Sequence, residues 1–255
     1  MSAEIEFRNV SYATQQGRVL LDDISFALEA GTTTAVLGRS GSGKTTLLRT
    51  VNRMVEPTDG EVLVHGKPNV DADLITLRRS IGYVIQETGL FPHFTVERNV
   101  GVVLEVEGRP REQRVRRSKE LLAAVGLDPE IFAHRYPHQL SGGQRQRVGL
   151  ARALAAEPRI LLMDEPFGAL DPLTRSEMQD MLRDLLRRLH TTVLLVTHDL
   201  DEALYLGDRI ALLGAGRLIT HVAPDEFTTS REPEVEAYFR AFHRGDHRAK
   251  GVQPV

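Results

Sequence analysis

The stretch that decides the fold is Ala35-Val36-Leu37-Gly38-Arg39-Ser40-Gly41-Ser42-Gly43-Lys44-Thr45. Its last eight residues fit G-x-x-x-x-G-K-[ST], the pattern of a glycine-rich loop that wraps phosphate groups. Such a loop needs a strand before it and a helix after it. The loop follows three apolar residues, and a helical spacing of apolar residues comes next between residues 47 and 54. The alternative, a plain turn of glycine and serine, does not need this context.

The chemistry of such a loop follows from its backbone. Consecutive N–H groups turn inward around phosphate oxygens, and the N-terminus of the next helix adds positive potential. We expect Lys44 to hold the β- and γ-phosphates of a nucleoside triphosphate and the Thr45 hydroxyl to bind Mg²⁺. The loop indicates a nucleotide site, but it does not distinguish among kinases, GTPases and motor ATPases.

Two adjacent carboxylates, Asp164 and Glu165, follow the apolar run at residues 160–163. Ligands of open α/β sheets bind at the edge where strands end, so this position is close to the expected phosphate loop. We expect Asp164 to hold hydrated Mg²⁺ and Glu165 to orient or deprotonate the attacking water. The alternative is an acidic turn after a strand. A kinase would need a phosphoacceptor site instead, so the adjacent glutamate favours hydrolysis.

A further motif, Leu140-Ser141-Gly142-Gly143-Gln144, precedes a helical pattern. Ser141 and Gln144 have the spacing of a capping box, and on this pattern alone a well-capped helix is the favoured interpretation. However, each of the two glycines in the first turn lowers helix stability by roughly 1 kcal/mol relative to alanine. Close approach of a phosphate to exposed N–H groups is one reason for glycines there.

The wider pattern predicts an α/β fold in which helices cover a sheet. Apolar residues alternate in the first 35 residues, which predicts half-buried antiparallel strands. Short continuous apolar runs predict strands of a parallel sheet buried on both faces. These runs are residues 35–37, 83–85, 160–163 and 193–196.

The remaining segments are mostly helical in pattern. Residues 101–157 carry no strong strand signal and predict an inserted helical subdomain, and a helix is expected near residues 178–189. The glycines at 214 and 216 predict a hairpin. A short helix is expected after Glu232, and residues 245–255 are polar and expected to be loose.

Composition narrows the function classes. The 255 residues contain 32 Lys and Arg against 35 Asp and Glu, so the basic excess of a phosphate-backbone binder is absent and nucleic acid is not expected as a partner. The sequence has no cysteine, which removes disulfides and thiolate metal sites. It has neither a membrane-length apolar run nor a secretory leader pattern, and we expect a cytosolic protein.

Taken together, the motifs resemble the nucleotide-binding subunit of an ABC transporter, in order from Tyr12 to about Val222. The matching segments are the Walker A loop at 38–45, the Q-loop at Gln86, the LSGGQ signature at 140–144, Walker B and the catalytic glutamate at Asp164 and Glu165, the D-loop at 169–171 and the switch histidine His198.

The resemblance implies a P-loop NTPase (RecA-like) core with an N-terminal antiparallel β subdomain and an inserted α-helical signature subdomain. The cassette is expected over residues 1–228, with the helical subdomain at about 87–158 and a short helix and tail at 229–255. No regulatory domain is expected within the chain. Repair-type ABC ATPases with long coiled coils or cysteine zinc sites do not fit, because neither feature is present.

The resemblance also implies a mechanism. Two subunits face each other head to tail, with ATP between the Walker A loop of one and the signature of the other. The residues implied as catalytic are Lys44, Gln86, Glu165 and His198. Those implied to bind the nucleotide are Tyr12, Gly38, Arg39, Ser40, Gly41, Ser42, Gly43, Lys44, Thr45, Thr46, Ser141, Gly142, Gly143, Gln144 and Asp171, and those implied to bind Mg²⁺ are Thr45, Gln86 and Asp164. For Tyr12, packing within a strand is the alternative to stacking on adenine.

The implied partners are a second copy of the chain, integral membrane permease subunits and, indirectly, a substrate-binding protein. Leu90, Phe91 and Phe94 are candidates for the permease contact, with core packing as the alternative. The protein is then expected at the inner face of the cell membrane. Segments 87–96, 135–139 and 166–172 look most like those of importers of glycine betaine, carnitine, choline and related osmoprotectants. The alternatives are an importer ATPase for another solute and a soluble ATPase that acts on a protein partner.

Overall fold

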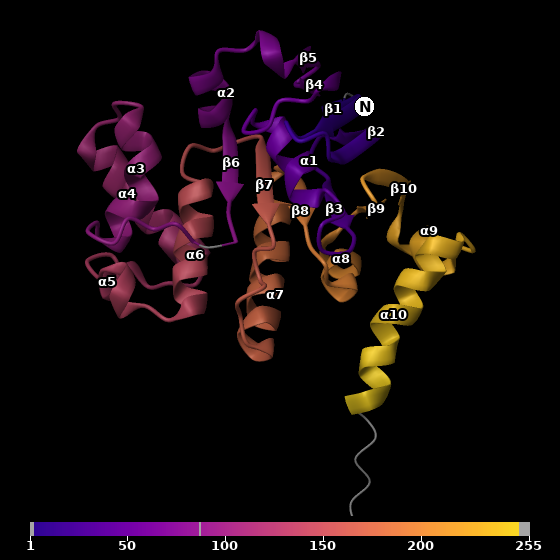
Figure 1. Ribbon diagram of the computed structural model, residues 1–255. Helices are drawn as coiled ribbons and strands as arrows, with labels where there is room; N and C mark the ends of the chain where they lie inside the picture. Colours follow the sequence, from indigo (N-terminus) through magenta and orange to yellow (C-terminus); the bar gives the residue numbers. More distant parts are fainter. Residues whose placement is uncertain (1–2, 87, 250–255) are drawn as a thin grey trace, which may run out of the picture.

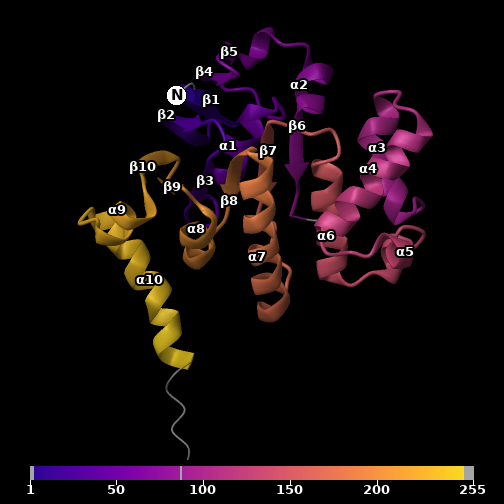
Figure 2. The same cartoon turned by 180° about the vertical axis from the view of Figure 1, so that it is seen from behind.

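The computed structural model describes residues 3–86 and 88–249, with side chains described as far as residue 242. Glu87, at the start of the expected helical subdomain, and residues 250–255 of the expected loose tail lie outside the described residues. Of the two sheets, one lies at the centre of the molecule and the other at the top of the view in Figure 1. A group of helices lies on one flank and the C-terminal helix on the other, and the view from behind shows the same arrangement (Figure 2).

The first sheet is antiparallel, with strand order β2-β1-β4-β5. Its strands are β1 (Ala3–Ala13), β2 (Val19–Glu29), β4 (Asp59–Val64) and β5 (Lys67–Pro68). Alternate residues of β1 and β2 enter the core, where the rings of Phe7 and Phe26 stack with centroids 4.8 Å apart. This confirms the predicted antiparallel strands in the first 35 residues.

The second sheet has the order β10-β9-β3-β8-β7-β6. Its strands are β3 (Thr33–Leu37), β6 (Ile81–Val84), β7 (Ile160–Asp164), β8 (Thr192–Val196), β9 (Arg209–Gly214) and β10 (Arg217–Val222). The first five are parallel to one another, and every residue of β3, β7 and β8 is buried. The predicted parallel sheet is therefore confirmed, although β6 ends one residue before Ile85.

The predicted hairpin near Gly216 is confirmed as the antiparallel pair β9–β10. The helix after the phosphate-loop motif, α1 (Lys44–Val51), is shorter than predicted. Met54 was expected on its apolar face, and this is wrong: Met54 is 55% exposed. The chain turns away because Asn52 caps the helix and Arg53 adopts a left-handed conformation with φ 53°.

Helices form the flank shown in magenta and pink in Figure 1. They are α3 (Val96–Val106), α4 (Arg111–Ala124), α5 (Pro129–Phe132) and α6 (Gly142–Ala153), and they confirm the predicted helical segment. Val100, Leu122 and Val148 are fully buried members of one core cluster that continues into β7 and β8. This shared core joins the helical flank to the sheet.

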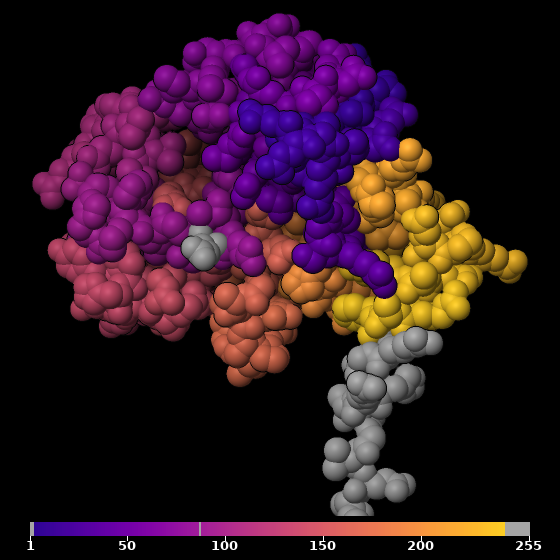
Figure 3. Space-filling view, in the orientation of Figure 1, coloured from indigo at the N-terminus to yellow at the C-terminus, as the bar shows by residue number. Residues whose placement is uncertain are grey.

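The other helices lie around the two sheets. They are α2 (Leu74–Ser80), α7 (Pro172–Leu189), α8 (Leu200–Leu206), α9 (Pro224–Thr229) and α10 (Pro233–Ala249). The last of these is not the expected short helix, because it continues through residues 245–249, which were assigned to the loose tail. Figure 3 shows α9 and the described part of α10 in yellow, packed beside the orange hairpin. Among the described residues, none of the helices combines the length and apolar character required to cross a bilayer.

Candidate functional site

The loop between β3 and α1 is built so that side chains cannot replace its key glycines. Gly38 has φ 156°, and a Cβ there would lie 2.4 Å from the carbonyl oxygen of Leu213. Gly43 has φ 100°, and a Cβ there would lie 2.5 Å from the carbonyl oxygen of Leu20. Gly43 also occupies the N-cap of α1 and supplies no side-chain cap. The first N–H groups of α1 therefore have no side-chain partner at the cap, which suits an anion.

Lys44 lies across this loop. Its ammonium donates to the carbonyl oxygens of Gly38 at 2.8 Å and Arg39 at 3.1 Å. Burial lowers the pKa of Lys44, while the charges of Glu165 and Asp164 act to raise it. The buried hydroxyl of Ser42 has no hydrogen-bond partner within the described chain. A cation, an unpartnered hydroxyl and free amide groups around one loop fit a polyphosphate.

The Walker B carboxylate meets the first helix directly. The hydroxyl of Thr45 donates to Oδ1 of Asp164 at 2.8 Å, although 119 residues separate them in the sequence. Burial raises the pKa of Asp164, and the bond from Thr45 opposes that shift. A hydroxyl and a carboxylate side by side at the phosphate loop are oxygen donors of the kind Mg²⁺ binds. The predicted metal pair Thr45 and Asp164 is thus brought together.

Glu165 adopts a left-handed conformation with φ 46° directly after β7. Its backbone N–H donates to the carbonyl of Val196 at 2.9 Å, which fixes the turn against the end of β8. His198 follows that strand, and its Nδ1 lies 3.3 Å from Oε2 of Glu165. The His198 side chain is 61% exposed and that of Glu165 24%. A non-glycine residue in this conformation is strained, and the bond to Val196 helps to hold it in place.

The other predicted residues near the loop are arranged less tightly. Gln86 is exposed two residues beyond Val84, the last residue of β6, which pairs with Met163, so it follows this strand at the edge that carries Asp164. Tyr12 packs against the apolar cluster of the first sheet, as the packing alternative predicts. Arg39, Ser40 and Gly41 are exposed, and Thr46 is half-buried.

The signature segment forms the predicted capping box. Ser141 Oγ accepts from the Gln144 N–H at 3.2 Å, and Gln144 Oε1 accepts from the Ser141 N–H at 2.9 Å. Ser141 and Gly142 are exposed. In Figures 1 and 2 α6 belongs to the helical flank and lies apart from α1, so the monomer does not bring the signature to the phosphate loop.

The two signature glycines have different reasons for being glycine. A Cβ on Gly143 would lie 2.5 Å from Cγ2 of Thr174 on α7, which is a packing constraint within the monomer. A Cβ on Gly142 would meet nothing within 4 Å. On sequence alone, both are candidates for close phosphate approach. The structure leaves only Gly142, of the two, without an internal packing reason.

This difference predicts opposite stability effects. Gly143→Ala is expected to lower the free energy of unfolding by about 1–3 kcal/mol through the clash with Thr174, and Gly142→Ala to raise it by up to about 1 kcal/mol through helix propensity. Urea denaturation measures both. Adding Thr174→Ser, which removes the clashing methyl, should restore most of the loss in Gly143→Ala. An equal effect of the two alanine variants would contradict this packing.

Asp171 has a local role that the resemblance did not reveal. It caps α7, and its carboxylate accepts from the Thr174 N–H at 3.1 Å. The hydroxyl and N–H of Thr174 lower the pKa of Asp171, which favours the charged cap. Sequence analysis could have found this cap, because Asp before Pro172 is a typical helix start.

Arg152 is a residue that sequence reasoning missed. It lies near the C-terminal end of α6 and donates to the carbonyls of Thr88 at 2.7 Å and Gly89 at 2.7 Å. These bonds tie the signature helix to the segment after Gln86. No signal in the sequence pairs Arg152 with this loop, since more than 60 residues separate them.

The aromatic loop after Gln86 is partly buried and partly free. Leu90 packs against the core of the helical flank, as the packing alternative predicts. Phe91 is 42% exposed, and its ring lies 5.0 Å from that of Phe94. Asn99 holds the loop by donating to the carbonyls of Phe91 and Phe94, each at 3.1 Å. The loop thus presents an aromatic surface on a fixed backbone.

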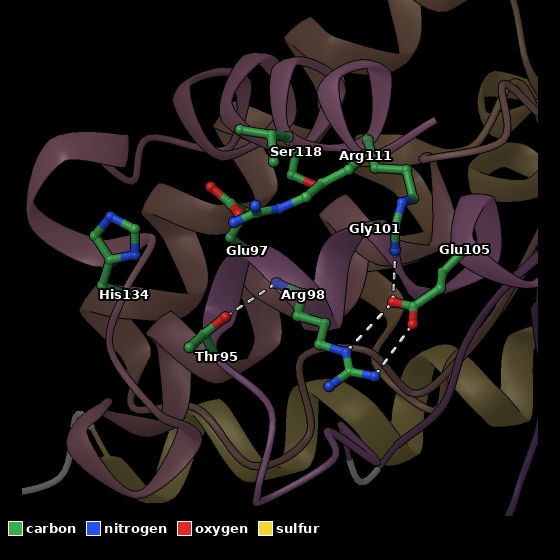
Figure 4. Close-up of a pocket in the computed structure, with 10 residues that line it drawn as sticks. Thr95, Glu97, Arg98, Gly101, Glu105, Arg111, Ser118 and His134 are labelled. Atoms are coloured by element: carbon green, nitrogen blue, oxygen red, sulfur yellow. Dashed lines mark hydrogen bonds and ion pairs between the residues drawn. The ribbon is translucent and has the colours of Figure 1, made fainter. Parts of the chain in front are cut away.

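A cavity of about 370 Å³ continues from this loop between α3 and α4 (Figure 4). The Arg98 guanidinium lies 3.8 Å above the Phe94 ring and also binds Glu105, which lies 2.7 Å from Arg114 as well. The cavity therefore adjoins the aromatic loop, and much of its lining charge is internally paired.

Comparison with known proteins gives the family. The profile described as "ABC transporter" matches residues 21–168, so the chain belongs to the ABC transporter family. The chain is 45% identical over 222 residues to the choline transport ATP-binding protein OpuBA of Bacillus subtilis, covering 87% of this chain and 58% of that protein. It is 46% identical over 225 residues to the osmoprotectant import ATP-binding protein OsmV of Salmonella typhimurium, covering 88% and 59%.

A solved structure has the same architecture. The dimeric post-hydrolysis state of the ATP-binding cassette MJ0796, bound to ADP and phosphate, superposes with a TM-score of 0.78 at 35% identity and covers 86% of this chain and 98% of that one. The expected P-loop NTPase fold is therefore confirmed. The chain spans less than three fifths of the two curated relatives, at 58% and 59% of their lengths.

Proposed function

We propose that the chain binds and hydrolyses ATP and that this drives import of osmoprotectants, such as glycine betaine, carnitine or choline, through separate membrane subunits. The observation that carries the ATPase proposal is the contact between Thr45 and Asp164 at 2.8 Å, beside Lys44 and the Glu165–His198 pair. It brings four segments of the sequence to one edge of the sheet, around a loop that fits a polyphosphate.

Different residues of the chain bind the phosphates, hold the metal ion and activate water. The loop amides and Lys44 bind the phosphates, and Thr45 and Asp164, with Gln86, are the residues that would hold Mg²⁺. That ion supplies charge neutralisation at the phosphates when bound. Glu165 orients water and accepts its proton, because its carboxylate stands at the strand edge beside the loop. His198 contacts Glu165 and reaches solvent, so it is placed to donate to the terminal phosphate.

The isolated chain provides half of each site. The exposed Ser141 and Gly142 lie at the N-terminus of α6, a 12-residue helix, and this end attracts anions. The signature lies apart from the phosphate loop of its own chain, so a second copy placed head to tail would supply it. The dimeric state of the MJ0796 structure supports this arrangement. By the same analogy, we assign Tyr12 to contact with the adenine ring. We assign Asp171 to the contact between the two subunits.

We assign the binding site for the membrane subunits to the helical flank. Phe91 is exposed and its ring contacts Phe94, which lies under the Arg98 guanidinium that lines the cavity. Arg152 connects the segment that follows Gln86 to the signature helix, so a displacement of the segment would act on that helix through these hydrogen bonds. An amphipathic cytoplasmic helix of a permease is the occupant that fits. We therefore propose that the protein acts at the inner face of the membrane.

The names of two relatives support the proposed solute. OpuBA is named for choline transport and OsmV for osmoprotectant import, and identities of 45% and 46% extend over most of this chain. The test is ATPase activity of the chain in vesicles with its co-purified membrane subunits and their binding protein. Glycine betaine or choline is expected to raise turnover severalfold, and a hexose is the control. Stimulation by a hexose or a metal ion, without any by quaternary amines, would overturn the solute assignment.

A further inference from the structure

The C-terminal helix α10 reaches the nucleotide edge through one side chain. Tyr238 lies in the second turn of α10, and its hydroxyl donates to the backbone carbonyl of His198 at 2.9 Å. The helix is fixed at this place by Val235, which is fully buried, and by Phe239, whose ring lies 5.6 Å from that of Phe227. The Tyr238 ring packs on the same cluster, which contains Leu37, the last residue before the phosphate loop.

The same phenol also faces the phosphate loop. Burial raises the pKa of Tyr238 to about 12, Asp199 adds to this, and the Arg39 charge and the Gly38 backbone act in the opposite direction. The hydroxyl therefore stays protonated at physiological pH and keeps its ability to donate. It lies between the first glycine of the loop and the backbone of the switch histidine.

On the side that faces the phosphate loop, the surroundings of this contact are not closely packed. A cavity of about 250 Å³ separates α10 from the loop, with Arg39 and Ser42 on one side and Glu234 and Tyr238 on the other. The flanks of His198 are held by other elements. Thr197 donates to Glu202 of α8 at 2.6 Å, and Asp199 lies 3.4 Å from Arg175 of α7.

We propose that Tyr238 is a positioning residue, which couples the placement of α10 to the backbone of His198 and through it to the imidazole that meets the terminal phosphate. This inference rests on the proposed ATPase function. It gives α10, which carries none of the family's motifs, a role in turnover. Displacement of α10 would release the His198 carbonyl, while the hydrogen bonds of Lys44 to the loop carbonyls and of Thr45 to Asp164 do not involve α10.

The test compares Tyr238→Phe, which removes the hydroxyl and keeps the ring, with the wild-type full chain. Tyr205→Phe is the matched control, since the Tyr205 hydroxyl binds Asp180 away from the loop. In the nucleotide-free protein, amide exchange in a peptide spanning residues 196–200 is expected to be about fivefold faster in Tyr238→Phe. Its kcat for ATP is expected to fall about three- to tenfold with KM within about twofold, and Tyr205→Phe should match wild type in both measurements.

The outcomes separate this inference from the function on which it rests. If amide exchange at residues 196–200 were unchanged in Tyr238→Phe, the proposed positioning role of Tyr238 would be wrong. Faster exchange with an unchanged kcat would also contradict that role. A raised KM with unchanged kcat would also overturn it, because that result indicates binding rather than positioning. A wild-type chain that does not hydrolyse ATP would overturn the proposed function, while exchange would still report on the contact itself.

Discussion

Glu165→Gln is expected to lower ATP turnover by about 10²- to 10⁴-fold, the range typical of general acid–base catalysis. Glutamine has nearly the same size and can still hydrogen-bond water and His198, but it cannot accept the proton. Because the substitution leaves Lys44, Thr45 and Asp164 unchanged, ATP affinity is expected to stay within a few-fold of wild type. Phosphate release measures turnover, and fluorescence of a labelled nucleotide measures binding.

The matched control is Glu112→Gln on the exposed side of α4, which removes a carboxylate far from the site. It should behave as wild type in both measurements. Wild-type turnover in Glu165→Gln would show that another group takes the proton, and the assignment of Glu165 would fall. Loss of binding with loss of turnover would instead indicate damage to the phosphate loop.

Lys44→Ala is expected to lower kcat/KM for ATP by about two to three orders of magnitude. Truncating one partner of a buried charged contact typically costs about 2–5 kcal/mol, and each 1.4 kcal/mol or so is tenfold. Lys44 also bridges the carbonyls of Gly38 and Arg39, so its loss loosens the loop that supplies the amide groups. Both effects act on nucleotide binding, so affinity should fall in this variant, unlike in Glu165→Gln.

Lys67→Ala tests whether any lysine has this effect, since Lys67 is exposed on β5. It should retain wild-type kcat/KM. Thermal unfolding checks that Lys44→Ala is folded before its kinetics are interpreted. If a folded Lys44→Ala bound ATP with wild-type affinity, the loop would not be the phosphate site.

The parts of the fold that the sequence predicts are those set by local pattern. Buried parallel strands are continuous apolar runs, so β3, β7 and β8 were found. The strand β4 was missed, because only Val62, Leu63 and Val64 of its six residues are buried. Met54 was misplaced since its apolar spacing continues past the point where Asn52 ends the helix.

In the site, too, the contacts between motif residues were predictable, and those that depend on tertiary packing were not. Motif spacing predicted that Thr45 and Asp164 would meet, because strand ends of one parallel sheet share an edge. It did not predict three contacts. These are the packing of Gly143 on Thr174, the hydrogen bonds from Arg152 to the loop carbonyls after Gln86, and the hydrogen bond from Tyr238 to the His198 carbonyl. Each of these joins distant segments whose separation depends on tertiary packing, and none has a local pattern.

The central claim is that two copies of this chain enclose ATP between the phosphate loop of one and the signature of the other. The mass of Glu165→Gln in solution, measured by light scattering with and without MgATP, tests it most directly. We expect a single chain without nucleotide and twice that mass with MgATP, and Ser141→Arg on the same background should abolish the doubling. A single-chain mass at saturating MgATP would contradict the claim.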